Sequence, residues 1–99
     1  MASDWIKLRD NDSNIIWRNR KNPNLTLVAY SVVSVMKEMY GAKLEDIAEE
    51  DKNAWEVGAA LKGAGLAEYP EIVEGKQKAI ESIADLKEMY KKWGLEGLR

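Results

Sequence analysis

The sequence is organised around residues 25–41, which read LTLVAYSVVSVMKEMYG. Apolar side chains recur there at spacings of three and four residues, as they do on the face of an α-helix. Gly41 stands where a left-handed residue commonly ends a helix, and Asn24 or Thr26 can cap the start. The valines favour a strand locally. Because apolar residues fill nearly every side, we predict a central helix over residues 25–40, inside a core or an oligomer interface.

The residues before this segment predict a short β-hairpin over 5–19. Apolar and charged side chains alternate over residues 5–9, turn-forming residues follow at 10–14, and an apolar run occupies 15–17. The same residues have a second interpretation, a first helix that Ser3 would cap.

The residues after Gly41 predict further helices. Residues 44–62 have the pattern of two short helices joined by a turn, followed by a brief helical turn at 71–74. Residues 76–93 predict a C-terminal helix, and residues 94–99 are expected to fray. Its apolar positions step by four and three residues, as in a coiled coil: Ala79, Ile83, Leu86, Tyr90 and Trp93.

The pair of helices at 44–62 resembles the helix-turn-helix of transcription regulators, and residues 65–69 resemble the run that leads into their wing. The resemblance implies DNA binding by residues 44–66. The charge of the segment argues against it, because a helix that enters the major groove needs cations to neutralise phosphates, and this pair is acidic.

Together the elements predict a single, mainly α domain over residues 1–99: a small bundle of four to five helices with a short N-terminal hairpin. With 45% hydrophobic and 32% charged residues, a chain of 99 residues can bury its own core. The apolar helical surface exceeds what one small monomer covers, so we also predict a homodimer. The residues behind that prediction are Val28, Val32, Met36, Tyr90 and Trp93.

The chain contains no histidine and no cysteine, which removes thiolate nucleophiles, imidazole bases and the commonest metal ligands. Asp10, Asp12 and Asn14 match the opening of a calcium loop, but Ile15 and Lys21 stand where that loop needs glycine and glutamate. An Asx turn is the favoured interpretation. We therefore expect no catalytic activity, no metal and no cofactor.

No apolar run reaches the roughly 18 residues that cross a bilayer. Residues 1–5 lack the features of a secretory signal. We accordingly expect no membrane association and a cytoplasmic location.

Charge changes sign twice along the chain. Residues 1–36 hold five basic and three acidic residues, residues 37–74 hold four and ten, and residues 75–99 hold six and four. Such asymmetry influences the choice of partner rather than the fold.

These features favour a small intracellular adaptor or regulator that acts by protein–protein contact. Its candidate partner-binding residues are Glu45, Glu49, Glu50, Tyr90 and Trp93. The alternative is a nucleic-acid-binding regulator that uses residues 44–66 or the N-terminal segment, where tryptophan alternates with cations. Its candidate residues are Trp17, Arg18, Arg20, Lys21 and Lys52.

Overall fold

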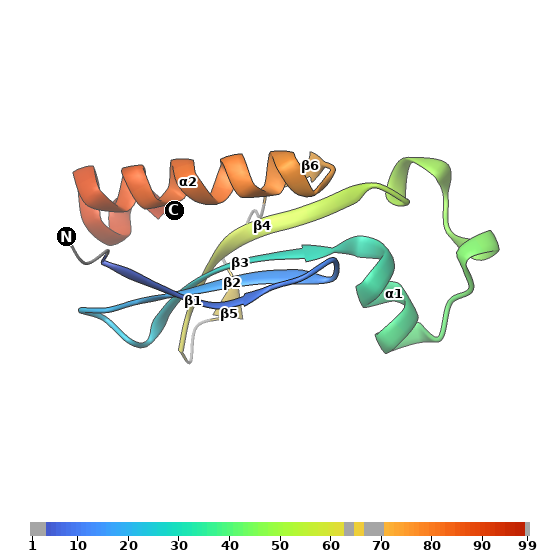
Figure 1. The fold of residues 1–99 in the computed structure, drawn as a ribbon, viewed down its shortest axis with the longest axis horizontal. Helices are drawn as coiled ribbons and strands as arrows, with labels where there is room; N and C mark the ends of the chain where they lie inside the picture. The colour runs from blue at the N-terminus through green and yellow to red at the C-terminus, as the bar shows by residue number, and fades with distance from the viewer. Residues whose placement is uncertain (1–3, 63–64, 67–70, 99) are drawn as a thin grey trace.

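A computed structural model of the chain describes residues 4–62, 65–66 and 71–98. It contains a twisted antiparallel sheet with one long helix lying along one face (Figure 1). The four long strands pair in chain order: β1 (Trp5–Asp10), β2 (Asn14–Asn19), β3 (Leu25–Ser31) and β4 (Ala54–Leu61). Two short strands also pair with β4, one near each of its ends: β5 (Gly65–Leu66) and β6 (Glu71–Glu74).

Two α-helices accompany the sheet, and they occupy different places. α2 (Lys76–Trp93) packs on the sheet face, in the range that the sequence predicts. α1 (Val32–Tyr40) continues from the end of β3 and projects from one end of the sheet (Figure 1). The prediction of a mainly α bundle of four to five helices is therefore wrong, because three segments predicted as helix are strands.

The predicted central helix is divided at Ser31, so that only its second half is helical. In β3, Leu25, Leu27 and Ala29 are buried while the residues between them are half-buried, which is the period of two of a strand. This segment pairs with β2 on one side and β4 on the other, and these pairings prevail over its helical spacing. The helix ends at Gly41, whose φ of 63° is left-handed as predicted.

The predicted helix-turn-helix is also absent, because its second helix is the strand β4. Trp55 and Val57 alternate with residues of the opposite face, and Trp55 stands opposite Ser31 on β3. In place of the first predicted helix, the chain forms two short 3-10 turns, η1 (Leu44–Asp46) and η2 (Glu49–Asp51). The residues predicted to lead into a wing form β5 at 65–66, and 67–69 lie outside the described residues. Residues 71–74, predicted as a helical turn, form β6.

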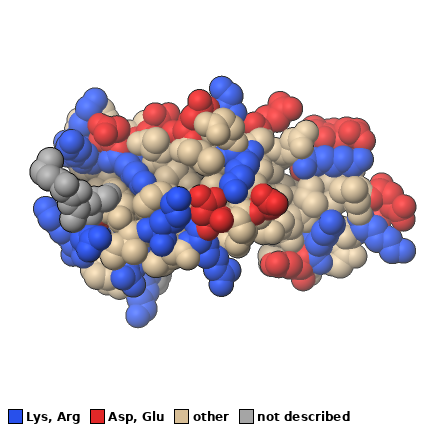
Figure 2. Space-filling model, in the orientation of Figure 1, with Lys and Arg blue, Asp and Glu red and all other residues tan. Residues whose placement is uncertain are grey.

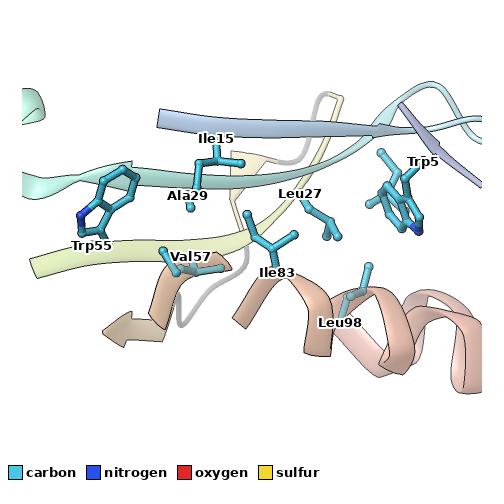
Figure 3. Packing of buried hydrophobic residues seen from close by; sticks show 10 residues of the cluster. Trp5, Ile15, Leu27, Ala29, Trp55, Val57, Ile83 and Leu98 are labelled. Carbon is cyan, nitrogen blue, oxygen red and sulfur yellow. The ribbon is translucent and has the colours of Figure 1, made fainter. Parts of the chain in front are cut away.

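The core lies between α2 and the sheet face beneath it (Figure 3). Its buried residues come from the four long strands, α2 and the segment after it: Trp5, Ile15, Leu25, Leu27, Ala29, Trp55, Val57, Ala79, Ile83 and Leu98. Leu86 and Tyr90 of the predicted seam pack against this cluster, whereas Trp93 is 62% exposed. Residues 94–98, expected to fray, form the 3-10 helix η3 (Gly94–Leu98), and Leu98 lies in the core.

The hairpin of β1 and β2 occupies the predicted segment and forms one edge of the sheet. Its register shifts between Lys7 and Arg9, so that Leu8 forms a bulge and is 48% exposed. Among the described residues, no helix is both long and apolar enough to cross a membrane.

α1 does not occupy the interior position that we predicted for residues 25–40. None of its residues is buried, and Met39 and Tyr40 are 69% and 76% exposed. Val32 and Met36, which the homodimer prediction names, are half-buried. Helix α1 therefore leaves apolar surface uncovered in the single chain.

Candidate functional site

The residues predicted to bind a protein partner lie at the two ends of an elongated molecule, which measures 44 × 27 × 21 Å. Glu45, Glu49 and Glu50 lie on the turns beyond α1, at the end opposite the start of β1 (Figure 1). Tyr90 and Trp93 lie in the last turn of α2, at the end where β1 begins. The five residues predicted to form one partner-binding site therefore belong to two separate candidate surfaces.

The first surface, which we call the acidic surface, surrounds a hollow of about 270 Å³ between η2 and β6. Three carboxylates line it, those of Glu49, Glu50 and Glu74, together with apolar side chains. Ile72 is 66% exposed there, while Ala54 is buried at its base. The acidic surface thus combines negative charge with an apolar contact area.

Two of its carboxylates have no salt bridge within the described part of the chain, namely Glu50 and Glu74. Glu49 differs, because its carboxylate lies 2.6 Å from the ammonium group of Lys52. Glu45 is exposed on η1 and does not line the hollow. Lys52, predicted for nucleic-acid binding, is therefore placed within the acidic surface instead.

The second surface, which we call the basic end, is formed by the turn after β2 and the last turn of α2. Its residues are Arg20, Lys21, Lys91, Lys92 and Trp93. Two contacts bring these segments together through the start of β1. The Arg20 backbone N–H donates to the Asp4 carbonyl at 2.7 Å, and the ring of the next residue, Trp5, meets the Tyr90 ring edge-on at 5.7 Å. Figure 2 shows Lys and Arg side chains gathered at this end.

Trp17 and Arg18, predicted to bind nucleic acid together, point to opposite faces of β2. Trp17 faces α2, where the ammonium group of Lys87 lies 3.2 Å from the ring centre and that of Lys7 lies 5.2 Å away. Arg18 is half-buried on the other face, and its Nε has no hydrogen-bond partner among the described residues. Because Lys87 covers the Trp17 ring, that ring is not free to stack on a base.

Desolvation lowers the pKa of Lys87, and the charge of Lys7 lowers it further. The attraction between the ammonium group and the Trp17 ring acts in the opposite sense, because it favours the charged form. The contact therefore joins α2 to the hairpin as a packing interaction.

The turn that resembles half a calcium loop is an Asx turn. The Asn11 side-chain oxygen accepts hydrogen bonds from the backbone N–H groups of Ser13 and Asn14, both at 2.8 Å. Asp10 faces Lys76 at 3.0 Å and Lys7 at 3.1 Å, and hydrogen bonds to these two lysines hold the pKa of Asp10 below its usual value. No group of three or more potential ligands in the described residues is arranged to hold a metal ion.

One further polar pair lies on the sheet face that α2 leaves uncovered. The Tyr30 hydroxyl donates a hydrogen bond to the carboxylate of Glu56, its direct partner across β3 and β4. Burial raises the pKa of Tyr30 to about 12, and the bond to Glu56 and the charge of Glu56 contribute in the same direction. The phenol is thus neutral at ordinary pH and acts as a fixed donor.

Sequence reasoning missed several residues of both surfaces. Ile72 and Glu74 were assigned to a helical turn, so their place beside η2 could not be expected. Lys91 and Lys92 lie within the predicted C-terminal helix, but they are not among the predicted site residues. The signal that could have found them is the reversal of charge along the chain, because the first and last segments contribute the Lys and Arg side chains that gather at one end, while Figure 2 shows acidic and basic side chains mixed at the other end.

The chain matches no protein-family model, and no curated protein or solved structure shows significant similarity to it.

Proposed function

We propose that the protein is a non-catalytic adaptor that holds a partner protein at its acidic surface. The observation that carries the proposal is the hollow between η2 and β6, where Glu50 and Glu74 accompany the exposed side chain of Ile72. Protein interfaces commonly combine an apolar centre with a polar rim. A cytoplasmic location belongs to the same proposal.

The chemistry of this surface specifies the kind of partner. Carboxylates around the hollow attract lysine or arginine and repel acidic segments. Ile72 offers an apolar contact that removes a side chain from water, with a gain of about 25 cal/mol per Å² of apolar area. The expected partner is therefore a protein segment that presents an apolar side chain flanked by basic residues.

A defined probe tests this proposal directly. A labelled peptide that alternates lysine and leucine should bind the protein, as followed by fluorescence anisotropy, and a peptide that alternates glutamate and leucine should not. The double variant Glu50→Lys/Glu74→Lys should weaken binding at least tenfold, a change of about 1.4 kcal/mol.

The matched control places the same charges elsewhere. Glu81→Lys/Asp85→Lys alters two exposed carboxylates of α2, outside the acidic surface, with the same change in net charge. It should bind the basic peptide nearly as well as the wild-type protein. Equal weakening by both double variants would show that net charge alone governs binding, and the proposal would fail.

A second candidate function is nucleic-acid binding at the basic end. It is favoured by the position of Trp93 directly after Lys91 and Lys92 and by the exposure of its ring, which at 62% is accessible to an unpaired base. Lys92 lies 5.7 Å from the centre of this ring. A single-stranded oligonucleotide is the fitting ligand, since its bases can reach the ring while its phosphates meet the lysines.

Anisotropy with labelled single-stranded and duplex oligonucleotides at about 50 and 200 mM salt tests this alternative, because phosphate contacts weaken steeply over that range. Arg20→Ala/Lys21→Ala should reduce salt-dependent binding, and Trp93→Ala should reduce binding to the single strand in particular. Lys52→Ala, at the other end, is the control. No binding at the lower salt would exclude this function.

A further inference from the structure

We infer that the basic end of one copy of this chain binds the acidic surface of a second copy, so that the protein associates head to tail. This inference rests on the proposed function, because it names the occupant of the same acidic surface. It predicts an open contact between unlike surfaces instead of a two-fold dimer.

The first argument is the charge of the two surfaces. Lys91 and Lys92 end α2, and Arg20 and Lys21 lie on the neighbouring turn, whereas Glu50 and Glu74 face the hollow without salt bridges in the described residues. Opposite charges on facing surfaces steer association and fix its orientation. Like surfaces would repel each other, so a symmetric contact through either end is disfavoured.

The second argument is the apolar side chain that each surface leaves uncovered. Trp93 is 62% exposed at the basic end, with Leu95 beside it at 40%. The acidic surface offers Ile72 at 66% exposure above a hollow of about 270 Å³. Tryptophan is enriched among the residues that dominate binding energy when they are buried in a pocket of the partner. Trp93, which follows Lys91 and Lys92 at the end of α2, also has the chemistry required of the partner, an apolar side chain with basic neighbours.

The third argument is geometry. The two surfaces lie at opposite ends of the long axis, with α2 running between them (Figure 1). One copy cannot satisfy its own acidic surface with its own basic end. Each copy therefore presents one surface of each kind, and contacts between copies produce a chain or a closed ring.

Sedimentation velocity of the wild-type protein over a range of concentrations tests the inference. Association should be strong at an ionic strength of about 0.01 M and lost near 1 M, where the Debye length falls from about 30 Å to about 3 Å. A protein that remains a monomer at the lower salt and at high concentration would overturn the inference.

Two neutralising variants then define the contact. The first variant removes charge from the acidic surface by Glu50→Gln/Glu74→Gln. The second variant removes two charges and the exposed ring of the basic end by Lys91→Gln/Lys92→Gln with Trp93→Ala. Each variant should be a monomer on its own. A mixture should form a one-to-one complex and nothing larger, because only one pair of intact surfaces remains. Self-association of either variant alone would contradict the head-to-tail arrangement.

The mixing experiment also controls for folding, since a misfolded variant would not restore the complex. Failure of this inference is distinguishable from failure of the proposed function. If the lysine–leucine peptide binds the wild-type protein while the protein remains a monomer, the acidic surface is a docking site for a different partner. If neither the peptide nor a second copy binds, both proposals fail.

Discussion

The ammonium group of Lys87 lies 3.2 Å from the centre of the Trp17 ring, so that a cation–π contact joins α2 to the outer hairpin. The lysine stem covers apolar surface on the ring while its charge remains partly desolvated. Trp17 has cationic neighbours in the sequence, and this contact shows that its ring contributes to the packing of α2 against the hairpin.

Lys87→Ala should therefore destabilise the protein by about 1 kcal/mol, the usual contribution of a partly exposed cation–π pair. The indole N–H resonance of Trp17 should shift in a two-dimensional NMR spectrum, because the ring loses its cover. Lys78→Ala is the control, since the Lys78 side chain is 70% exposed and forms its ion pair with Glu81, which is exposed on the same helix. Equal losses for both variants in urea unfolding would refute the contact.

The alternation of buried and half-buried side chains along β3 can be tested by substituting two neighbouring residues. Leu27→Ala should cost about 2–5 kcal/mol, because Leu27 is fully buried beneath α2 and its removal leaves a cavity. Val28→Ala should cost clearly less, since Val28 is half-buried on the other face. A central helix over 25–40 predicts no such alternation. Chemical denaturation of the two variants distinguishes the strand from the helix.

Asp10 connects the end of β1 to the first turn of α2 through Lys76, and this connection depends on pH. Its pKa lies below 3.8 in the folded protein, so its contribution to stability is present above 3.8 and is lost as the pH falls through the folded value. Asp10→Asn should therefore be less stable than wild type at neutral pH.

Urea unfolding at a series of pH values measures this difference, which should shrink towards zero in acid. Asp12→Asn is the matched control, because the Asp12 side chain is fully exposed and lies 3.9 Å from Lys76. A stability difference between Asp10→Asn and wild type that persists at low pH would refute the ion pair as its source.

Tyr30 should be a tyrosine that ionises only near pH 12, because burial and Glu56 both favour the neutral phenol. The bond it donates to Glu56 stabilises the fold below the ordinary pKa of 10.0 and is lost as the pH rises through about 12. An ultraviolet titration should contain a component with that midpoint, and Tyr30→Phe should remove it. Glu56→Gln should lower the midpoint without restoring the ordinary value, since burial is the larger cause.

Gly97 is required by the close approach of η3 to α2. A Cβ atom at this position would lie 2.4 Å from the carbonyl oxygen of Met89. Gly97→Ala should destabilise the protein by about 1–3 kcal/mol and release Leu98 from the core. Leu98→Ala should reproduce much of the loss without a clash, and thermal unfolding of the two variants compares them. An unchanged melting temperature for Gly97→Ala would show that η3 does not dock as described.

The sequence contained good local signals for the two ends of the fold. The Asx turn at Asn11 has dense turn chemistry, Gly41 ends a helix at a left-handed residue, and the seam of α2 is strongly periodic. These features depend on neighbours within a few residues, so they could be predicted without knowledge of the tertiary structure.

The centre of the fold could not be predicted in this way. In residues 25–31, apolar side chains fit both the helical and the strand period, and pairing with β2 and β4 decides between them. In β4, the local signals conflict. Gly58 in the middle of the segment disfavours a helix, and the spacing of Trp55 and Val57 fits the period of a strand, but the alanines favour a helix. The acidic surface depends on β6 lying beside η2, a long-range contact that no local pattern predicts.

The bulge at Leu8 restricts how further molecules can be added to this sheet. β1 is the outer strand, and its broken register, together with the charges of Lys7 and Arg9, leaves no straight run of backbone on which a strand from elsewhere could extend the ladder. Growth into cross-β fibres is disfavoured at this edge. The hairpin edge is therefore protected against aggregation by strand addition.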